Sequence, residues 1–117
     1  MNFDEAILSH SQWRIRLQSV IAGTSKEQLD PAVVCLDDKC ALGQWIYGEA
    51  RIYVNLPEYD ALRSSHAEFH KSAAQVLRLS TAGKLAEATA IMKNGAFQEA
   101  SLRTISAIRK LRLKIAV

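Results

Sequence analysis

The 117 residues carry 15 lysines and arginines against 12 acidic residues, and 49% of them are hydrophobic. This composition is typical of one globular domain. No apolar run approaches the ~20 residues of a membrane span, and the N-terminus lacks the basic start and apolar stretch of a secretion signal. We therefore expect a single cytoplasmic domain over residues 1–117, with no membrane insertion.

The first half of the chain predicts one long helix followed by a connection. Apolar residues three and four positions apart predict a helix over residues 3–21, with Gly23 as its stop. Residues 24–39 show little pattern, although Asp30 and Pro31 are typical of the start of a short helical turn. Five glycines and two prolines in the whole chain favour long helices over many short strands.

A short helix is predicted next, beginning at Cys40 and ending at about Tyr47. Asp37 and Asp38 precede it, and either side chain is expected to cap its first turn. Gly48 is the expected stop. This helix matters because it carries a cysteine at its start.

The second half of the chain predicts three further helical segments. One begins at Pro57, a residue favoured in the first helical position, and extends to about Ser80. Another follows Gly83 and is broken at Asn94-Gly95, before a long last helix that contains Ile115. With no alternating strand pattern, the fold class is all-α. The expected architecture is an antiparallel four-helix bundle with an additional short helix carrying the cysteine.

The chain has three histidines, and all of them fall on apolar, core-facing stripes. His10 lies in the stripe of the first helix, and His66 and His70 lie four residues apart on one face of the helix that begins at Pro57. A buried imidazole needs partners for its ring nitrogens. One metal ion would satisfy all three histidines at once.

Cys40 supplies a donor of a different kind from a third element. Three imidazole nitrogens and one thiolate make a filled tetrahedral set suited to zinc, whereas calcium and magnesium prefer oxygen. Each feature alone has an ordinary interpretation, since a buried cysteine often behaves as a small hydrophobic residue. Together they predict a zinc site formed by His10, Cys40, His66 and His70.

Three sequence blocks contain these candidates: His10-Ser11-Gln12-Trp13, Cys40-Ala41-Leu42-Gly43-Gln44-Trp45 and His66-Ala67-Glu68-Phe69-His70. They resemble the signature of the chemoreceptor zinc-binding (CZB) domain family. The family pattern is a His-x-x-Trp, then a Cys-x-x-Gly-x-Trp, then a His-x-x-x-His. All three blocks are intact and in order, and the resemblance covers nearly the whole chain.

The resemblance implies one zinc ion per chain, held by the four candidate residues, in a four-helix bundle. It also implies a bacterial sensory module, attached to a chemoreceptor or a diguanylate cyclase or standing alone, and in several cases dimeric. By this analogy the domain senses zinc, or oxidants that attack the zinc-bound cysteine. It then controls chemotaxis or cyclic di-GMP output through an attached domain or a partner.

Other functions fit part of the pattern. A structural, zinc-stapled dimerisation module would use the same donors. A hemerythrin-like di-iron oxygen carrier would need more histidines and bridging acids, and Glu68 falls off the face shared by His66 and His70. A zinc hydrolase would need an open coordination position, and four protein ligands leave none. The chain is therefore not expected to be an enzyme.

Two features stand outside the family pattern. The last eighteen residues hold five basic side chains and no acid, which is typical of a solvated helix end; without interleaved aromatic residues they do not indicate nucleic-acid binding. Cys35 is interpreted as a packed or loop thiol. A second hypothesis is that Cys35 traps oxidised Cys40.

Overall fold

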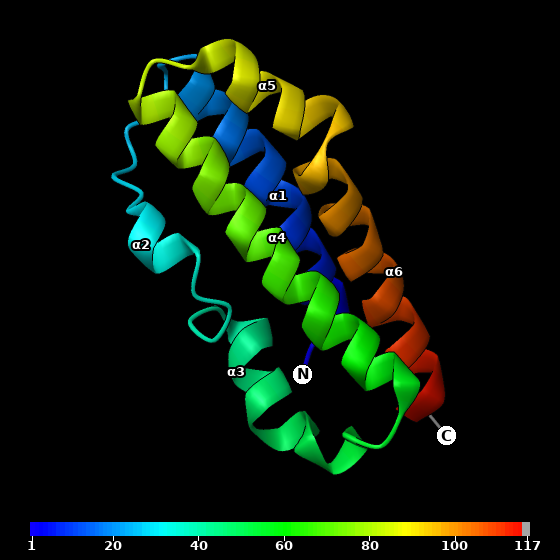
Figure 1. Cartoon of the computed structure of the whole chain (residues 1–117). Coiled ribbons are helices and arrows are strands. Elements are labelled where there is room, and N and C mark those ends of the chain that lie inside the picture. Colours follow the sequence, from blue (N-terminus) through cyan, green and yellow to red (C-terminus); the bar gives the residue numbers. More distant parts are fainter. Residues whose placement is uncertain (116–117) are drawn as a thin grey trace.

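Between residues 1 and 115, which the structure describes, the computed structural model contains six α-helices, one 3-10 helix and no strand (Figure 1). In chain order they are α1 (Phe3–Ile21), α2 (Pro31–Val34), α3 (Ala41–Tyr47), η1 (Glu49–Tyr53), α4 (Pro57–Thr81), α5 (Leu85–Asn94) and α6 (Ala96–Ile115). The all-α bundle is confirmed: α1, α4, α5 and α6 form it, and α3 is the additional short helix next to Cys40.

The ends of the long helices follow local chemistry. The Asn2 side chain caps α1 by accepting a hydrogen bond of 3.0 Å from the Glu5 backbone N–H. Pro57 occupies the first turn of α4, as predicted. Gly23 and Gly83 adopt φ values of 74° and 77°, which side chains disfavour, so both glycines stop the preceding helix.

The direction of the helices is set by the long connection between α1 and α4. Residues 22–56 lead back along the bundle, so α1 and α4 run in the same direction and α6 runs antiparallel to both (Figure 1). The Arg112 guanidinium of α6 lies 2.8 Å from the Asp4 carboxylate of α1, which places the end of α6 beside the start of α1. This parallel arrangement brings His10 level with the histidines of α4.

The apolar core has two clusters. One is centred on Phe69 and Phe97, whose rings lie 5.2 Å apart between α4 and α6. The other contains Leu42 and Ile46 of α3, packed with residues of α4 and α6 that include Leu62. Fully burying one such side chain contributes about 1.5–3 kcal/mol. The three histidines fall between these clusters along α1 and α4.

Two details near α3 differ from the sequence-based expectation. Neither Asp37 nor Asp38 caps α3; Cys40 itself is the N-cap, and its sulfur accepts from the Gly43 backbone N–H. The Asp37 carboxylate instead accepts a hydrogen bond from the Tyr47 hydroxyl. The 3-10 helix η1 was not predicted, because its short run has no apolar periodicity.

None of the helices between residues 1 and 115 combines the length and the hydropathy needed to cross a lipid bilayer.

Candidate metal centre

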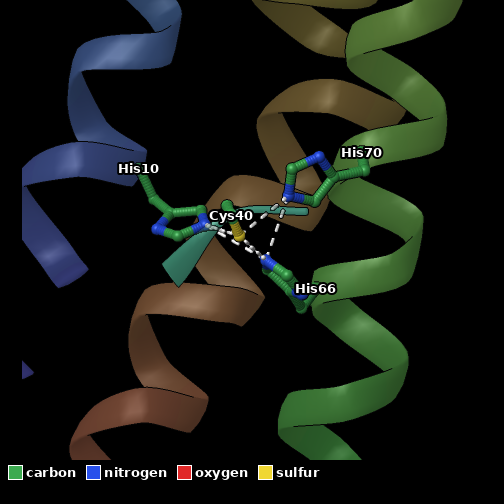
Figure 2. A group of neighbouring side chains, drawn as sticks. All are labelled: His10, Cys40, His66 and His70. Atoms are coloured by element: carbon green, nitrogen blue, oxygen red, sulfur yellow. Dashed lines mark hydrogen bonds between the residues drawn. The ribbon is translucent and has the colours of Figure 1, made fainter. Parts of the chain in front are cut away.

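The four candidate donors meet at one point inside the bundle (Figure 2). We call them the donor cluster: His10 from α1, Cys40 at the start of α3, and His66 and His70 from α4. Their donor atoms all lie within 4.8 Å of one another. The three histidines are only 0–3% exposed, whereas Cys40 is half-buried. The sequence-based expectation that every histidine faces the core is confirmed.

Most separations within the donor cluster are close to those around a zinc ion, and every pair of donor atoms lies within 4.8 Å. His66 Nε2 lies 3.2 Å from His10 Nε2 and 3.0 Å from His70 Nε2. Cys40 Sγ lies 3.2 Å from His66 Nε2 and 3.6 Å from His70 Nε2, and its distance to His10 Nε2 is 4.0 Å. Around tetrahedral zinc, ligand nitrogens are about 3.4 Å apart, and nitrogen and sulfur about 3.6 Å. The donors present therefore fit zinc.

Backbone carbonyls orient two of the imidazoles. His10 Nδ1 lies 2.8 Å from the Ala6 carbonyl, and His70 Nδ1 lies 2.9 Å from the Val34 carbonyl. A carbonyl only accepts, so both Nδ1 atoms must carry the proton. In the neutral imidazoles the Nε2 atoms then present lone pairs to the centre of the cluster. This is the arrangement that prepares histidine to bind a metal.

His66 completes the case for a cation. Its Nδ1 is buried and has no hydrogen-bond partner among the described residues. Its Nε2 faces the lone pairs of both His10 and His70, and a single N–H there satisfies only one of them. The other hydrogen at the centre is that of the Cys40 thiol, a weak donor that lies 3.6 Å from His70 Nε2 and 4.0 Å from His10 Nε2. A metal ion bound at the three Nε2 atoms would replace these contacts with one bond to each lone pair.

The bundle also keeps the imidazoles free of extra protons. Burial lowers the pKa of His66 to about 2, and the neighbouring histidines act in the same direction. Burial is also the largest influence on His10 and His70, and it lowers the pKa of each, although their carbonyl partners act against it. At neutral pH all three rings are neutral and able to bind a metal without first losing a proton.

Cys40 is held at the cluster by its place at the start of α3. Its Sγ accepts from the Gly43 backbone N–H at 3.3 Å. Burial raises the pKa of the Cys40 thiol, and Asp37 adds to this, while the backbone N–H groups of Leu42 and Gly43 act to lower it. Without a cation the sulfur is therefore a thiol at neutral pH. A metal ion supplies the charge that favours the thiolate.

Gly43 lets the chain before Cys40 pass close to α3. A Cβ atom at this position would lie 1.7 Å from the Asp37 carbonyl oxygen and 2.7 Å from the carbonyl carbon. These are backbone atoms, so a side chain cannot be accommodated by a rotamer change. The glycine of the second sequence block thus fixes the path of residues 37–40, and with it the position of the sulfur.

The two tryptophans of the sequence blocks pack around the site. The Trp13 ring lies 6.5 Å from the His70 ring, and the Arg16 guanidinium covers Trp13 at 3.9 Å. Trp45 packs edge-on against Phe3 at 5.3 Å, which ties α3 to α1. Neither indole forms a hydrogen bond to a member of the donor cluster. Their role is to hold the elements that carry the donors.

The sequence predicted all four members of the donor cluster, and the structure brings all four together. It did not predict the orienting carbonyls of Ala6 and Val34. Every residue has a carbonyl, so no side-chain pattern marks these two. For Val34 the sequence offered one weak indication: Asp30 and Pro31 predict a short helical turn just before the cysteine block, and the Val34 carbonyl lies at the end of that turn.

Comparison with known families decides the identity of the domain. The sequence profile described as the chemoreceptor zinc-binding domain matches residues 10–77, which is more than half of the chain. The chain belongs to the chemoreceptor zinc-binding domain family. The matched segment begins at His10 and includes the whole donor cluster. No curated protein and no solved structure matched the chain.

Family membership and geometry agree on the cofactor. The domain is a zinc-binding signalling domain, and its group of three histidines and one cysteine is able to hold one metal ion. This metal-ligating group contains no carboxylate among the described residues. Glu68 is exposed and lies 3.6 Å from Lys71, so it does not approach the cluster.

Replacing Gly43 tests the fixed path of the cysteine segment. We expect Gly43→Ala to weaken zinc binding by about 10-fold to 100-fold, because the new Cβ displaces the Asp37 backbone and moves Cys40. Competition with a chromophoric chelator measures the affinity. Glu49→Ala changes an exposed residue of η1, just beyond α3, and serves as control. Equal affinities for the two variants would contradict the role of Gly43.

The lowered histidine pKa values predict a pH effect on the zinc-free protein. Below about pH 6.5 the unfolded chain binds protons that the folded chain excludes. The free energy of unfolding of the zinc-free protein therefore decreases as the pH is lowered, by up to about 1.4 kcal/mol per pH unit for each histidine. Urea unfolding of chelator-treated protein between pH 7 and pH 5 measures the slope. His66→Leu removes one titrating group and should give a shallower slope. Identical slopes would show that His66 does not contribute.

Proposed function

We propose that the donor cluster binds one zinc ion and that residues 1–117 act as a single regulatory domain of bacterial signalling. The observation that carries the proposal is the meeting of four nitrogen and sulfur donors within 4.8 Å. Zinc occupancy, or the chemical state of Cys40, is the input. The output is chemotaxis or cyclic di-GMP synthesis, controlled through an attached domain or a partner.

Bound zinc would join three separate elements through one positively charged centre. His66 and His70 are fixed by α4, which is buried along much of its length. His10 is fixed by α1 and by its bond to Ala6. Cys40 comes from the connection between α1 and α4 and is the donor least enclosed by the bundle. The proposed switch is therefore the attachment or release of the cysteine sulfur.

Other contacts limit what that release can move. The Tyr59 hydroxyl donates a 2.7 Å hydrogen bond to the Ile46 carbonyl, and Trp45 packs on Phe3. These contacts hold most of α3 on the bundle whether or not the sulfur is attached.

Residues 35–40, between α2 and α3, are bonded to α3 through Asp37 and Tyr47, and Cys35 packs against one apolar cluster. Cys40 is the member of this segment that reaches the donors of α1 and α4. We infer that residues 35–40 form the two-state element of the switch.

The same segment touches the site twice. Residue 34 precedes it and supplies the carbonyl bonded to His70 Nδ1, and Cys40 ends it. A movement that frees Cys40 therefore strains the orientation of His70 as well. Loss of the metal, or oxidation of the thiolate to a sulfenic acid, would act through this shared segment. Whether Cys35 traps the oxidised sulfur stays a prediction; both cysteines are free thiols in this structure.

The regulatory interpretation is favoured over catalysis by the number of donors. Four protein donors fill a tetrahedral site and leave no position for a substrate water. A purely structural, zinc-stapled dimerisation module would use the same cluster. A purely structural site is expected to enclose its ligands fully. Cys40 is only half-buried, which favours a regulatory site whose metal ion or cysteine sulfur can react with molecules in solution.

Family membership supports the remaining proposals about context. We propose that the domain works in the cytoplasm, as a homodimer, with a chemoreceptor, a diguanylate cyclase or another signalling protein as its partner, and without binding nucleic acid. Exposed leucines on α6, Leu102 and Leu113, offer apolar surface for such an interface. The Arg112 side chain is engaged with Asp4 instead of forming part of an open basic patch.

Metal content tests the proposed ligands. Tag-free wild-type protein is expected to contain about one zinc per chain, and Cys40→Ala should weaken binding by more than about 100-fold, since it removes a ligand outright. Cys35→Ala is the matched control, because Cys35 lies outside the donor cluster. Absence of zinc from supplemented wild-type protein would contradict the proposal. Two irons per chain would support the oxygen-carrier alternative.

Hydrogen exchange tests the proposed switch. Zinc removal should increase amide exchange in residues 35–43 and leave α6 unchanged, because the apolar clusters hold the bundle without metal. Circular dichroism of the zinc-free protein should remain helical. Identical exchange of residues 35–43 with and without zinc would contradict the switch, and complete loss of helix would show that the metal holds the whole fold.

A further inference from the structure

A cleft of about 370 Å³ leads from the surface to the metal centre. We call it the entry cleft; its walls come from the first two turns of α1 and the start of α3, and they include Glu5, Ser9, His10 and Cys40. We propose that zinc enters and leaves the donor cluster through the entry cleft, and that the Glu5 carboxylate is the first protein ligand it meets. This inference rests on the proposed function, in which the donor cluster holds zinc.

Burial around the donors favours this route. The three histidines are at most 3% exposed, so the bundle closes the site on their sides. Cys40 is the half-buried donor, and both it and His10 line the entry cleft. The larger cavity between α4 and α6, about 540 Å³, is lined by no member of the donor cluster. Of these two cavities, only the entry cleft leads to the donors.

The entry cleft is large enough for a metal ion that has not yet lost its water. One water takes about 30 Å³, so a cleft of about 370 Å³ admits an ion with several waters still attached. Two residues of the cleft wall, Ala6 and Leu42, are buried and apolar. Water must therefore be shed before the ion reaches the nitrogen and sulfur donors.

Glu5 supplies the chemistry for that step. Zinc accepts carboxylate oxygen as a ligand and binds more tightly to a set of imidazole and thiolate donors. A carboxylate in the cleft can thus hold the partly hydrated ion and pass it to His10 and Cys40. Its neighbour Asp4 is engaged by Arg112 of α6, whereas Glu5 forms no ion pair within residues 1–115.

A bulky side chain in the entry cleft tests the route. Ser9→Phe should slow both zinc uptake and zinc loss to a chelator by about tenfold, and the equilibrium affinity should stay the same because both rates change together. Ser11→Phe is the matched control, since Ser11 is exposed on α1 outside the cleft and bonds only to the Ile7 carbonyl. Unchanged rates in Ser9→Phe, or equal slowing in Ser11→Phe, would overturn the proposal.

Alkylation of the zinc-free protein gives a readout that does not depend on metal. Iodoacetamide reacts at a cysteine sulfur with loss of iodide, and peptide mass mapping resolves the two cysteines. Ser9→Phe should slow modification of Cys40 and leave Cys35, which does not line the entry cleft, unchanged. Equal modification of Cys40 in wild type and Ser9→Phe would overturn the route even if the protein bound zinc normally.

A pair of charge-removing variants tests the role of Glu5. Glu5→Gln should slow zinc uptake by about threefold to tenfold at low ionic strength, with a smaller effect in high salt. Asp4→Asn removes the same charge from the same helical turn but outside the cleft, and should change uptake much less. Equal effects of the two variants would overturn the role of Glu5. Wild-type protein that binds no zinc would instead overturn the proposed function, and the Cys40 alkylation rates would still decide the route.

Discussion

Three imidazoles buried side by side are the constraint on which the rest of this structure depends. Each ring carries two nitrogens into the buried interior of the bundle, and an unpaired polar atom there costs about 1–3 kcal/mol. Two of the three outer nitrogens are satisfied by backbone carbonyls, and that of His66 is not. The inner nitrogens face one another. A core of this kind is stable chiefly because large apolar clusters flank it and because a cation can occupy its centre.

The arrangement of the helices follows from the need to align these rings. His10 meets His66 and His70 because α1 and α4 run in the same direction, and two parallel helices require a long return connection. That connection is not a passive linker. It supplies both the Val34 carbonyl and the Cys40 sulfur, so the segment that closes the fold also completes the metal centre.

Most of this could be predicted from the sequence. Helical periodicity located α1, α4 and α6, glycine and proline marked their ends, and the three blocks named every donor. The sequence predicted an antiparallel bundle but not which helices run in the same direction; that α1 and α4 do so (Figure 1) does not follow from periodicity, which describes each helix alone. The cap of α3 was assigned to Asp37 or Asp38 from side-chain preference, and the structure gives that place to Cys40, whose sulfur already had to lie there as a donor. The position of the metal centre in the folded chain, and not the local preference for aspartate, thus determines which residue caps α3.

The order of the donors along the chain has a consequence for biosynthesis. A growing chain offers only His10 and Cys40 until residue 66 has been made, and two donors hold zinc far less tightly than four. The other two donors arrive together, within one turn of α4. A complete donor set therefore needs the chain through His70 and α4 packed beside α1, and a chain cut short before His70 lacks it. The complete site is thus a property of the two packed helices together and of neither one alone.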